Sequence, residues 1–311
     1  MEHILEVKSV SKSYANHKAL NEVSLSIPKG VIFGLLGPNG AGKTSLIRII
    51  NQITAPDSGE ILLNGKKLAP GDENVIGYLP EERGLYKKMK VGEQALYLSM
   101  LKGMSKKEAL EALKYWFTKF EIIDWWDKKV EELSKGMAQK IQFIVTVLHK
   151  PDLLILDEPF SGFDPINTNL IKQEILKLKE EGTTIIFSTH NMGSVEEICD
   201  EIALINKSEK ILDGKVREIK EQYKPNVFEV RFKGNMIGFT NALWTGFELL
   251  DHHTDEFDTT IAKIRILKDH KPNELLQAIL PHVEVTGLQE ILPSMNEIFI
   301  QNVNQEKEVV S

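Results

Sequence analysis

The sequence contains one cysteine and no long apolar run, and each of these features excludes a class of protein. Cys199 excludes an internal disulfide and a cysteine-rich metal site, which fits a reducing compartment. Its apolar helical surroundings favour a buried structural thiol. Nowhere do roughly 18 apolar residues follow one another, so we expect no membrane-spanning helix. Met1 to Glu6 contain acids where a signal peptide would carry basic residues, so we expect a cytoplasmic location.

Basic residues are also scarce relative to acidic ones. The 311 residues include 38 Lys and Arg against 45 Asp and Glu, which gives a formal net charge of −7. This balance leaves room for a local basic patch but disfavours a broad nucleic-acid surface, so no nucleic-acid partner is expected. The length suits two domains better than one.

What the sequence does contain is a glycine-rich loop between an apolar strand, predicted over Val31 to Leu36, and a helix. The loop consists of Gly37, Pro38, Asn39, Gly40, Ala41, Gly42, Lys43, Thr44 and Ser45. In the pattern G-x-x-x-x-G-K-T, backbone N–H groups surround phosphate oxygens, the lysine reaches the β and γ phosphates, and the threonine hydroxyl binds Mg²⁺. The flanking strand and helix argue against a mere glycine-rich turn with a surface lysine. We therefore predict a nucleotide-phosphate site.

Two carboxylates follow a second apolar strand, Leu153 to Leu156. Because ligands bind at the carboxyl edge of an open parallel sheet, Asp157 and Glu158 are expected to face the phosphates. Asp157 would hold Mg²⁺ directly or through water, and Glu158 would act as the general base that activates the attacking water. The alternative is an acidic strand end before a turn at Pro159.

A third segment, Leu133-Ser134-Lys135-Gly136-Met137, lies between these two motifs and precedes a predicted helix. Alone, Ser134 could be a simple helix N-cap. In its position, the segment resembles the Leu-Ser-Gly-Gly-Gln signature of the ATP-binding-cassette (ABC) ATPase family, and the resemblance covers residues 1 to about 220. It implies that Ser134 and Gly136 contact the γ-phosphate of ATP held by a second copy of the chain, in a head-to-tail homodimer. Lys135 and Met137 depart from the family pattern.

The same resemblance assigns further roles. Tyr14 matches the aromatic residue that stacks on adenine, and Ser161 to Asp164 match a dimer-interface loop. His190 matches a histidine that touches the γ-phosphate and steadies Glu158. Together with the roles given above to Lys43 and Glu158, this makes Glu158, His190 and Lys43 the expected catalytic residues. Glu81 stands where most cassettes carry a glutamine, and its carboxylate is an oxygen ligand suited to Mg²⁺. The implied ligands are ATP and Mg²⁺, with Thr44, Glu81 and Asp157 around the metal.

The predicted fold class is α/β, a P-loop NTPase domain of the ABC type with an antiparallel β subdomain and a helical subdomain, plus a small C-terminal α+β domain. Alternation of strand and helix patterns assigns residues 1–223 to the ATPase domain, with an all-helical insertion at about 91–150. Residues 224–303 read as a split β-α-β accessory domain, in which His252 and His253 are expected on a solvated loop rather than at a metal site. The polar tail, residues 304–311, is expected to be disordered.

Three classes of function are compatible with these motifs. We favour the ATP-hydrolysing subunit of a membrane export system, peripheral on the cytoplasmic face of the cell membrane and coupled to a separate permease; the single cassette and the segment Pro80 to Tyr86 resemble the sodium- and drug-export branch. The second class is a soluble cassette ATPase of DNA repair, chromosome organisation or translation, but long heptads, zinc cysteines and a second cassette are absent. The third is a GTPase or small-molecule kinase, for which Asn206 to Glu209 is a poor guanine-reading motif. The transported substrate is not predicted.

Overall fold

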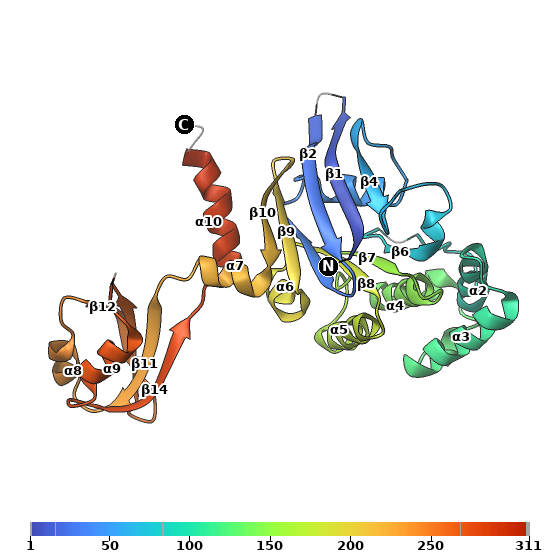
Figure 1. Ribbon diagram of the computed structural model, residues 1–311. Coiled ribbons are helices and arrows are strands. Elements are labelled where there is room, and N and C mark those ends of the chain that lie inside the picture. Colours follow the sequence, from blue (N-terminus) through green and yellow to red (C-terminus); the bar gives the residue numbers. More distant parts are fainter. Residues whose placement is uncertain (1, 16, 83, 268, 309–311) are drawn as a thin grey trace. The chain divides into compact units, whose positions relative to one another are not determined.

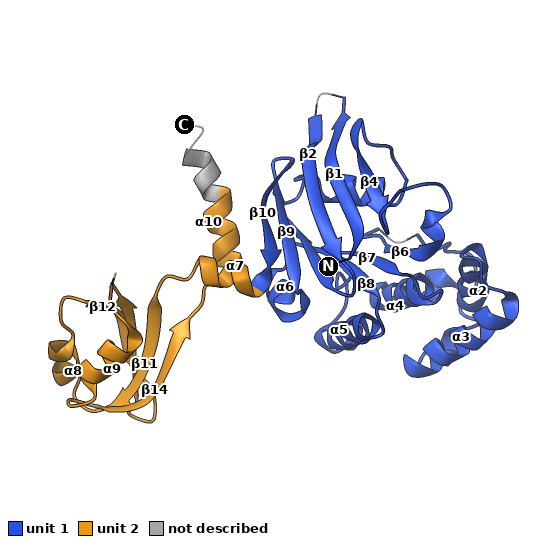
Figure 2. Cartoon of the chain, viewed as in Figure 1, with its two compact units in different colours: residues 1–216 blue, residues 217–311 orange. Residues whose placement is uncertain are grey.

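The computed structural model describes residues 2–15, 17–82, 84–267 and 269–308, with side chains described up to Val303. The chain forms two compact units, residues 1–216 and 217–311 (Figure 2). This division falls before the boundary that we expected near residue 224, because helix α7 (Val216–Gln222) belongs with the second unit. The hydroxyl of Tyr223, just after α7, donates to Asn302 Oδ1 at 2.9 Å within that unit.

The first unit is built on a six-stranded, mostly parallel sheet with the order β10-β9-β3-β8-β7-β6 (Figure 1). Its strands are β3 (Ile32–Leu36), β6 (Ile76–Leu79), β7 (Leu153–Asp157), β8 (Thr184–Thr189), β9 (Glu201–Asn206) and β10 (Glu209–Lys215). Every residue of β3, β7 and β8 is buried, as expected for central strands covered on both faces. Only β10 runs antiparallel, in the predicted hairpin with β9. The covering helices include α1 (Lys43–Ile50), α5 (Pro165–Glu180) and α6 (Met192–Ile198).

A second, antiparallel sheet with the order β2-β1-β4-β5 forms the predicted β subdomain. Its strands are β1 (His3–Tyr14), β2 (His17–Pro28), β4 (Ser58–Leu63) and β5 (Lys66–Lys67). β1 and β2 are longer than predicted because pairing continues to Tyr14 and His17, beyond the apolar residues that signalled the strands. One buried cluster joins side chains of this sheet, such as Val7 and Leu25, to Leu46 of α1 and Ile155 of β7. The two sheets therefore share a core.

The stretch from 91 to 150 is helical, as predicted. It contains α2 (Val91–Leu101), α3 (Lys106–Lys119) and α4 (Lys135–Val147), with short 3₁₀ turns at Ile123–Trp125 and Val130–Glu132. A Cβ on Gly92 would lie 2.3 Å from the Trp126 ring, so glycine is required there for the turn to pack on α2. An ion pair between Lys119 of α3 and the buried Glu174 of α5 ties this insertion to the sheet-covering helices.

The second unit has the order β11, α8, β12, β13, α9, β14, as the split β-α-β prediction requires. Its elements are α7, β11 (Val227–Lys233), α8 (Met236–Ala242), β12 (Phe247–Thr254), β13 (Thr260–Ile266), α9 (Pro272–Ile279), β14 (Glu284–Ile291) and α10 (Met295–Glu308). The sheet order is β12-β13-β11-β14, and all pairs are antiparallel. Phe232 and Phe239 stack at 4.2 Å within its separate core.

Two predictions for this unit were wrong in detail. His252 and His253 lie on β12 rather than on a loop, because β12 pairs with β13 as far as Thr254 and Thr260. The tail was expected to be disordered from residue 304, but α10 continues to Glu308, since Gln, Glu and Lys are good helix formers. The remaining tail residues, 309–311, lie outside the described part of the chain. Within that described part, no helix is both long and apolar enough to cross a membrane.

Candidate functional site

The glycine-rich loop leaves the carboxyl end of β3, and two of its glycines are required by their surroundings. Gly37 and Gly42 have φ angles of 146° and 116°, which side chains rarely allow. A Cβ on Gly37 would lie 2.1 Å from the Ile205 carbonyl oxygen, and one on Gly42 would lie 2.2 Å from that of Ala19. Among the described residues, no side chain caps the amino end of α1, so its first N–H groups can face a ligand, as in helix-terminal phosphate sites.

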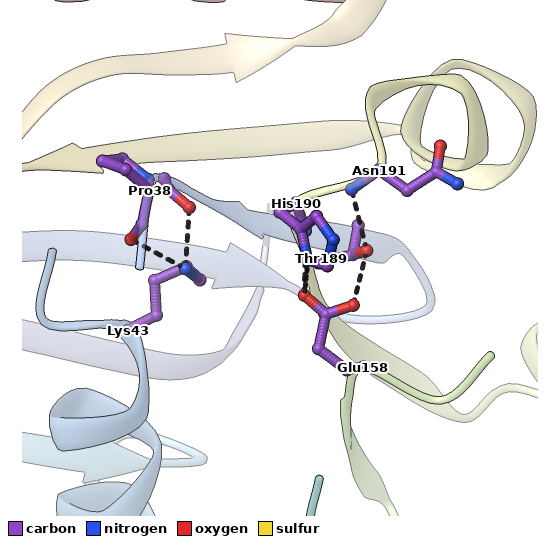
Figure 3. A network of polar contacts seen from close by, with 7 residues as sticks. Pro38, Lys43, Glu158, Thr189, His190 and Asn191 are labelled. Atoms are coloured by element: carbon purple, nitrogen blue, oxygen red, sulfur yellow. Dashed lines mark hydrogen bonds and ion pairs between the residues drawn. The ribbon is translucent and has the colours of Figure 1, made fainter. Parts of the chain in front are cut away.

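Lys43 is buried and directed into this loop. Its Nζ donates to the carbonyl oxygens of Gly37 at 2.7 Å and Pro38 at 3.1 Å (Figure 3). Burial lowers the pKa of Lys43, and the carboxylates of Glu158 and Asp157 oppose that shift by favouring the charged ammonium. The loop thus holds a cation with acidic groups facing it.

Asp157 and Glu158 stand at the carboxyl end of β7, two strands from β3 in the same sheet. Asp157 is buried, and burial raises its pKa, an effect that the nearby charges of Glu81 and Glu158 increase. Glu158 has a φ of 48°, in the left-handed region, where a non-glycine residue is strained. Its N–H donates to the Ser188 carbonyl at 2.9 Å, which fixes this unusual backbone against β8.

The Glu158 carboxylate is bonded through both of its oxygens (Figure 3). Oε1 accepts from the His190 N–H at 2.9 Å and contacts His190 Nδ1 at 2.6 Å, and Oε2 accepts from Thr189 Oγ1 at 3.1 Å. Because an ionised carboxylate only accepts, we assign a proton to Nδ1 of His190. The His190 side chain is 69% exposed, so its outer edge remains accessible to a ligand.

A cavity of about 420 Å³ gathers nearly all of these groups. It is lined by Tyr14, His17, Ala19, Asn39, Gly40, Gly42, Lys43, Thr44, Ser45, Glu81, Asp157, Glu158 and His190. Residues from β1, the glycine-rich loop, β7 and the end of β8 therefore converge on one space. Three of them, Thr44, Glu81 and Asp157, offer the hard oxygen atoms that suit Mg²⁺.

Comparison with known proteins agrees with this geometry. Residues 20–161 match the family described as "ABC transporter". The ABC transporter ATP-binding protein YhaQ of Bacillus subtilis (strain 168) is 49% identical over 225 residues, covering 72% of this chain and 76% of its own. The chain belongs to the ABC transporter ATP-binding family. It is accordingly an ATP-binding subunit of an ABC transporter.

Of three further likenesses, two extend over the rest of the chain. The linearmycin resistance ATP-binding protein LnrL of the same B. subtilis strain is 30% identical over 310 residues, covering 96% of this ABC subunit and 97% of its own chain. A solved structure of an ATP binding subunit of an ABC transporter superposes with a TM-score of 0.67 at 30% identity, covering 71% of this chain and 93% of that one. Residues 214–303 match the "ATP-binding protein DrrA1-3-like, C-terminal domain" family.

Five predicted ligand residues of this ABC subunit are not among those lining the cavity. Gly37, Pro38 and Ala41 belong to the glycine-rich loop itself, whereas Ser134 and Gly136 lie on another segment. Ser134 is exposed at the N-cap of α4, where its Oγ accepts from the Met137 N–H at 3.2 Å. A Cβ on Gly136 would lie 3.3 Å from the Gly162 carbonyl oxygen, so the start of α4 rests on the loop after Glu158. Within one copy, the signature segment and the phosphate loop form separate surfaces.

Three residues of the site escaped sequence reasoning. His17 and Ala19 line the cavity because β2 begins directly opposite Tyr14. Thr189 reaches the site through its bond to Glu158. The only sequence signal for Thr189 was its place before His190 at a strand end, and threonine at such a place usually serves β pairing alone.

Proposed function

We propose that this ABC subunit hydrolyses ATP to ADP and phosphate with Mg²⁺, and that the energy drives export through a separate membrane permease. The observation that carries the proposal is the Glu158 carboxylate, held by Thr189 and His190 on the cavity that also contains Lys43. A carboxylate that has three hydrogen-bond partners, on a residue with a strained backbone, suits a general base beside a phosphate when it shares a cavity with a buried lysine.

In the proposed reaction, Glu158 removes a proton from water as the water oxygen bonds to the γ-phosphorus. The bond between that phosphorus and the β–γ bridging oxygen then breaks, which releases ADP and inorganic phosphate. Lys43 and the amino end of α1 stabilise the charge that develops on the phosphoryl oxygens. His190 would keep Glu158 in place through its Nδ1 proton, and a second proton on Nε2, at the accessible outer edge, would donate to a γ-phosphate oxygen. Tyr14, which also lines the cavity, would stack on adenine.

The residues present fit a magnesium ion. No group of three or more His, Cys, Asp or Glu side chains forms a metal cage in the part of the chain that the structure describes. Mg²⁺ needs no such cage, since it usually takes one or two carboxylates together with phosphate oxygens and water. Thr44, Asp157 and Glu81 would hold it, and the ion would neutralise charge on the phosphates.

Glu81 allows a direct test of this metal assignment. We expect Glu81→Ala to raise the Mg²⁺ concentration for half-maximal ATPase activity several-fold, because one oxygen ligand is lost. Glu81→Gln keeps a ligand oxygen without the charge, so its requirement should fall between those of Glu81→Ala and the unmodified protein. Magnesium titration of the ATPase rate measures this, with Glu82→Ala on the next exposed residue as the matched control. An unchanged requirement in Glu81→Ala would remove Glu81 from the metal site.

We further propose that two copies pair head to tail, so that Ser134 and Gly136 of one copy close the ATP site of the other. The support is physical. The amino end of α4 is exposed at Ser134, its first turn carries no acidic side chain, and Lys135 adds positive charge there. Such an end attracts phosphate. ATP would then join the two copies, and hydrolysis would let them separate.

Mixing two inactive variants tests the shared site. Ser134→Asp keeps a good N-cap but places a negative charge against the phosphate, and Lys43→Ala disables the other half of the site. Alone, each variant should lose most ATPase activity. Mixed together, they should regain a measurable fraction, because the mixed pair contains one site with neither change. Lys43→Ala mixed with Glu158→Gln is the control and should regain nothing, since both changes belong to the same half. Recovery in neither mixture would contradict the head-to-tail pair.

The export role rests on relationship rather than on geometry. The relative LnrL, which matches along nearly the full chain, is a resistance ATP-binding protein for linearmycin. We propose a similar export system here, with this chain bound to its permease at the cytoplasmic face of the membrane. The second unit, which resembles the C-terminal domain of such proteins, would support pairing or regulation.

A further inference from the structure

We infer that Thr189 is a positioning residue for hydrolysis, and that its hydroxyl selects Oε2 of Glu158 as the oxygen that receives the proton of the attacking water. This inference rests on the proposed ATPase activity. It adds to that activity the residue that orients Glu158 and the carboxylate oxygen that takes the proton.

The two oxygens of Glu158 have different numbers of partners. A carboxylate oxygen offers about two lone pairs. Oε1 uses both, one for the His190 N–H at 2.9 Å and one for His190 Nδ1 at 2.6 Å. Among the hydrogen bonds of the described residues, Oε2 has a single partner, Thr189 Oγ1 at 3.1 Å. Oε2 is therefore the oxygen with room for a water molecule.

The Thr189 hydroxyl is itself oriented. Its oxygen accepts from the Asn191 N–H at 3.1 Å, so its own hydrogen is available for the carboxylate. A hydroxyl has one hydrogen to give, and Oε2 is the acceptor within reach. The two hydrogen bonds, from the Asn191 N–H to Thr189 and from Thr189 to Glu158, therefore point in the same direction, toward the carboxylate (Figure 3).

Burial makes this support firmer than that of His190. Thr189 is 2% exposed and is the last residue of β8, where it lies opposite Leu36 of β3, immediately before the phosphate loop. Its branched Cβ restricts χ1 rotation. The His190 side chain, by contrast, is 69% exposed and can exchange its partners. Thr189 thus holds Oε2 at a fixed distance from the loop, whatever contact His190 makes.

The matched variants are Thr189→Val, which keeps the shape without the hydroxyl, and Thr189→Ser, which keeps the hydroxyl. We expect Thr189→Val to lower kcat about tenfold or more, as for loss of a hydrogen bond to a charged group, with KM for ATP within about twofold of the unmodified value. Thr189→Ser should retain most of kcat. Steady-state ATPase kinetics at saturating Mg²⁺ measure both parameters.

Thr184→Val is the structural control. Thr184 is buried at the opposite end of β8, and its Oγ1 accepts from the Gly30 N–H at 2.9 Å. It should lose stability to heat much as Thr189→Val does, without the fall in kcat. Should Thr189→Val fail to fold, Thr189→Ala against Thr189→Ser provides the same contrast.

The outcomes separate this inference from the proposed function. Glu158→Gln hydrolysing at the unmodified rate would overturn the ATPase mechanism itself. With Glu158→Gln inactive, an unchanged kcat in Thr189→Val would overturn the role of Thr189. Equal losses in the valine and serine variants, or a raised KM with unchanged kcat, would also overturn it, because packing or nucleotide contact would then explain the result.

Discussion

Replacing Glu158 with glutamine is expected to lower kcat for ATP hydrolysis by about 10²- to 10⁴-fold, the usual contribution of a general base. Glutamine has nearly the same shape, but its amide offers one acceptor oxygen in place of two and cannot take a proton from water. Asp157 and Lys43 remain in place, so ATP binding should persist. Glu158→Gln should therefore accumulate as an ATP-bound pair of copies.

Two measurements check this result. Phosphate release gives the rate, and size-exclusion chromatography with and without ATP gives the pairing. Glu111→Gln, an exposed change on α3, is the control for loss of one negative charge. Hydrolysis at the unmodified rate would remove Glu158 from its role. A variant that binds ATP yet stays a single copy would contradict the pairing instead.

Lys43→Ala is expected to weaken ATP binding itself, by about tenfold to a hundredfold. The buried ammonium is the cation held against the loop, and each hydrogen bond to a charged group contributes about 1.5–3 kcal/mol. Alanine also removes the bonds to the Gly37 and Pro38 carbonyls, so the loop loses order as well as charge. Both effects weaken the binding of the phosphates and leave the general base, Glu158, unchanged.

Equilibrium titration with ATP measures the dissociation constant for this variant. Lys114→Ala, which removes an exposed lysine from α3, should bind as the unmodified protein does. Thermal unfolding without nucleotide then separates a weakened loop from a collapsed domain. Unchanged ATP affinity in folded Lys43→Ala would contradict the assignment of this lysine to the phosphates.

The site was largely predictable because its parts follow strands of one parallel sheet. Buried apolar runs marked β3, β7 and β8, and the carboxyl ends of parallel strands meet at one edge. The phosphate loop, Asp157, Glu158 and His190 therefore had to lie near one another. Tyr14 and Glu81 could be placed only through resemblance to the ABC family, and the structure puts both on the same cavity.

Other features could not be derived from the sequence. The bond from Thr189 depends on a side-chain torsion and on the left-handed backbone at Glu158, and neither has a pattern in the residues. The place of His252 on β12 depends on pairing with β13, a partner from further along the chain. Tertiary pairing also extended β1 to Tyr14 beyond its apolar signal. Local propensity does not predict the bounds of a strand where pairing with a distant segment determines them.

The left-handed backbone at Glu158 lowers the thermal stability of the protein at the position where the proposed mechanism needs a carboxylate. This conformation costs roughly 1–2 kcal/mol for a residue with a Cβ, and glycine or asparagine adopts it more readily. A laboratory selection for thermostability alone would therefore favour those two residues at position 158 and discard the carboxylate. Under the proposed mechanism, a chain selected in this way would unfold at a higher temperature but would lack the base that activates water.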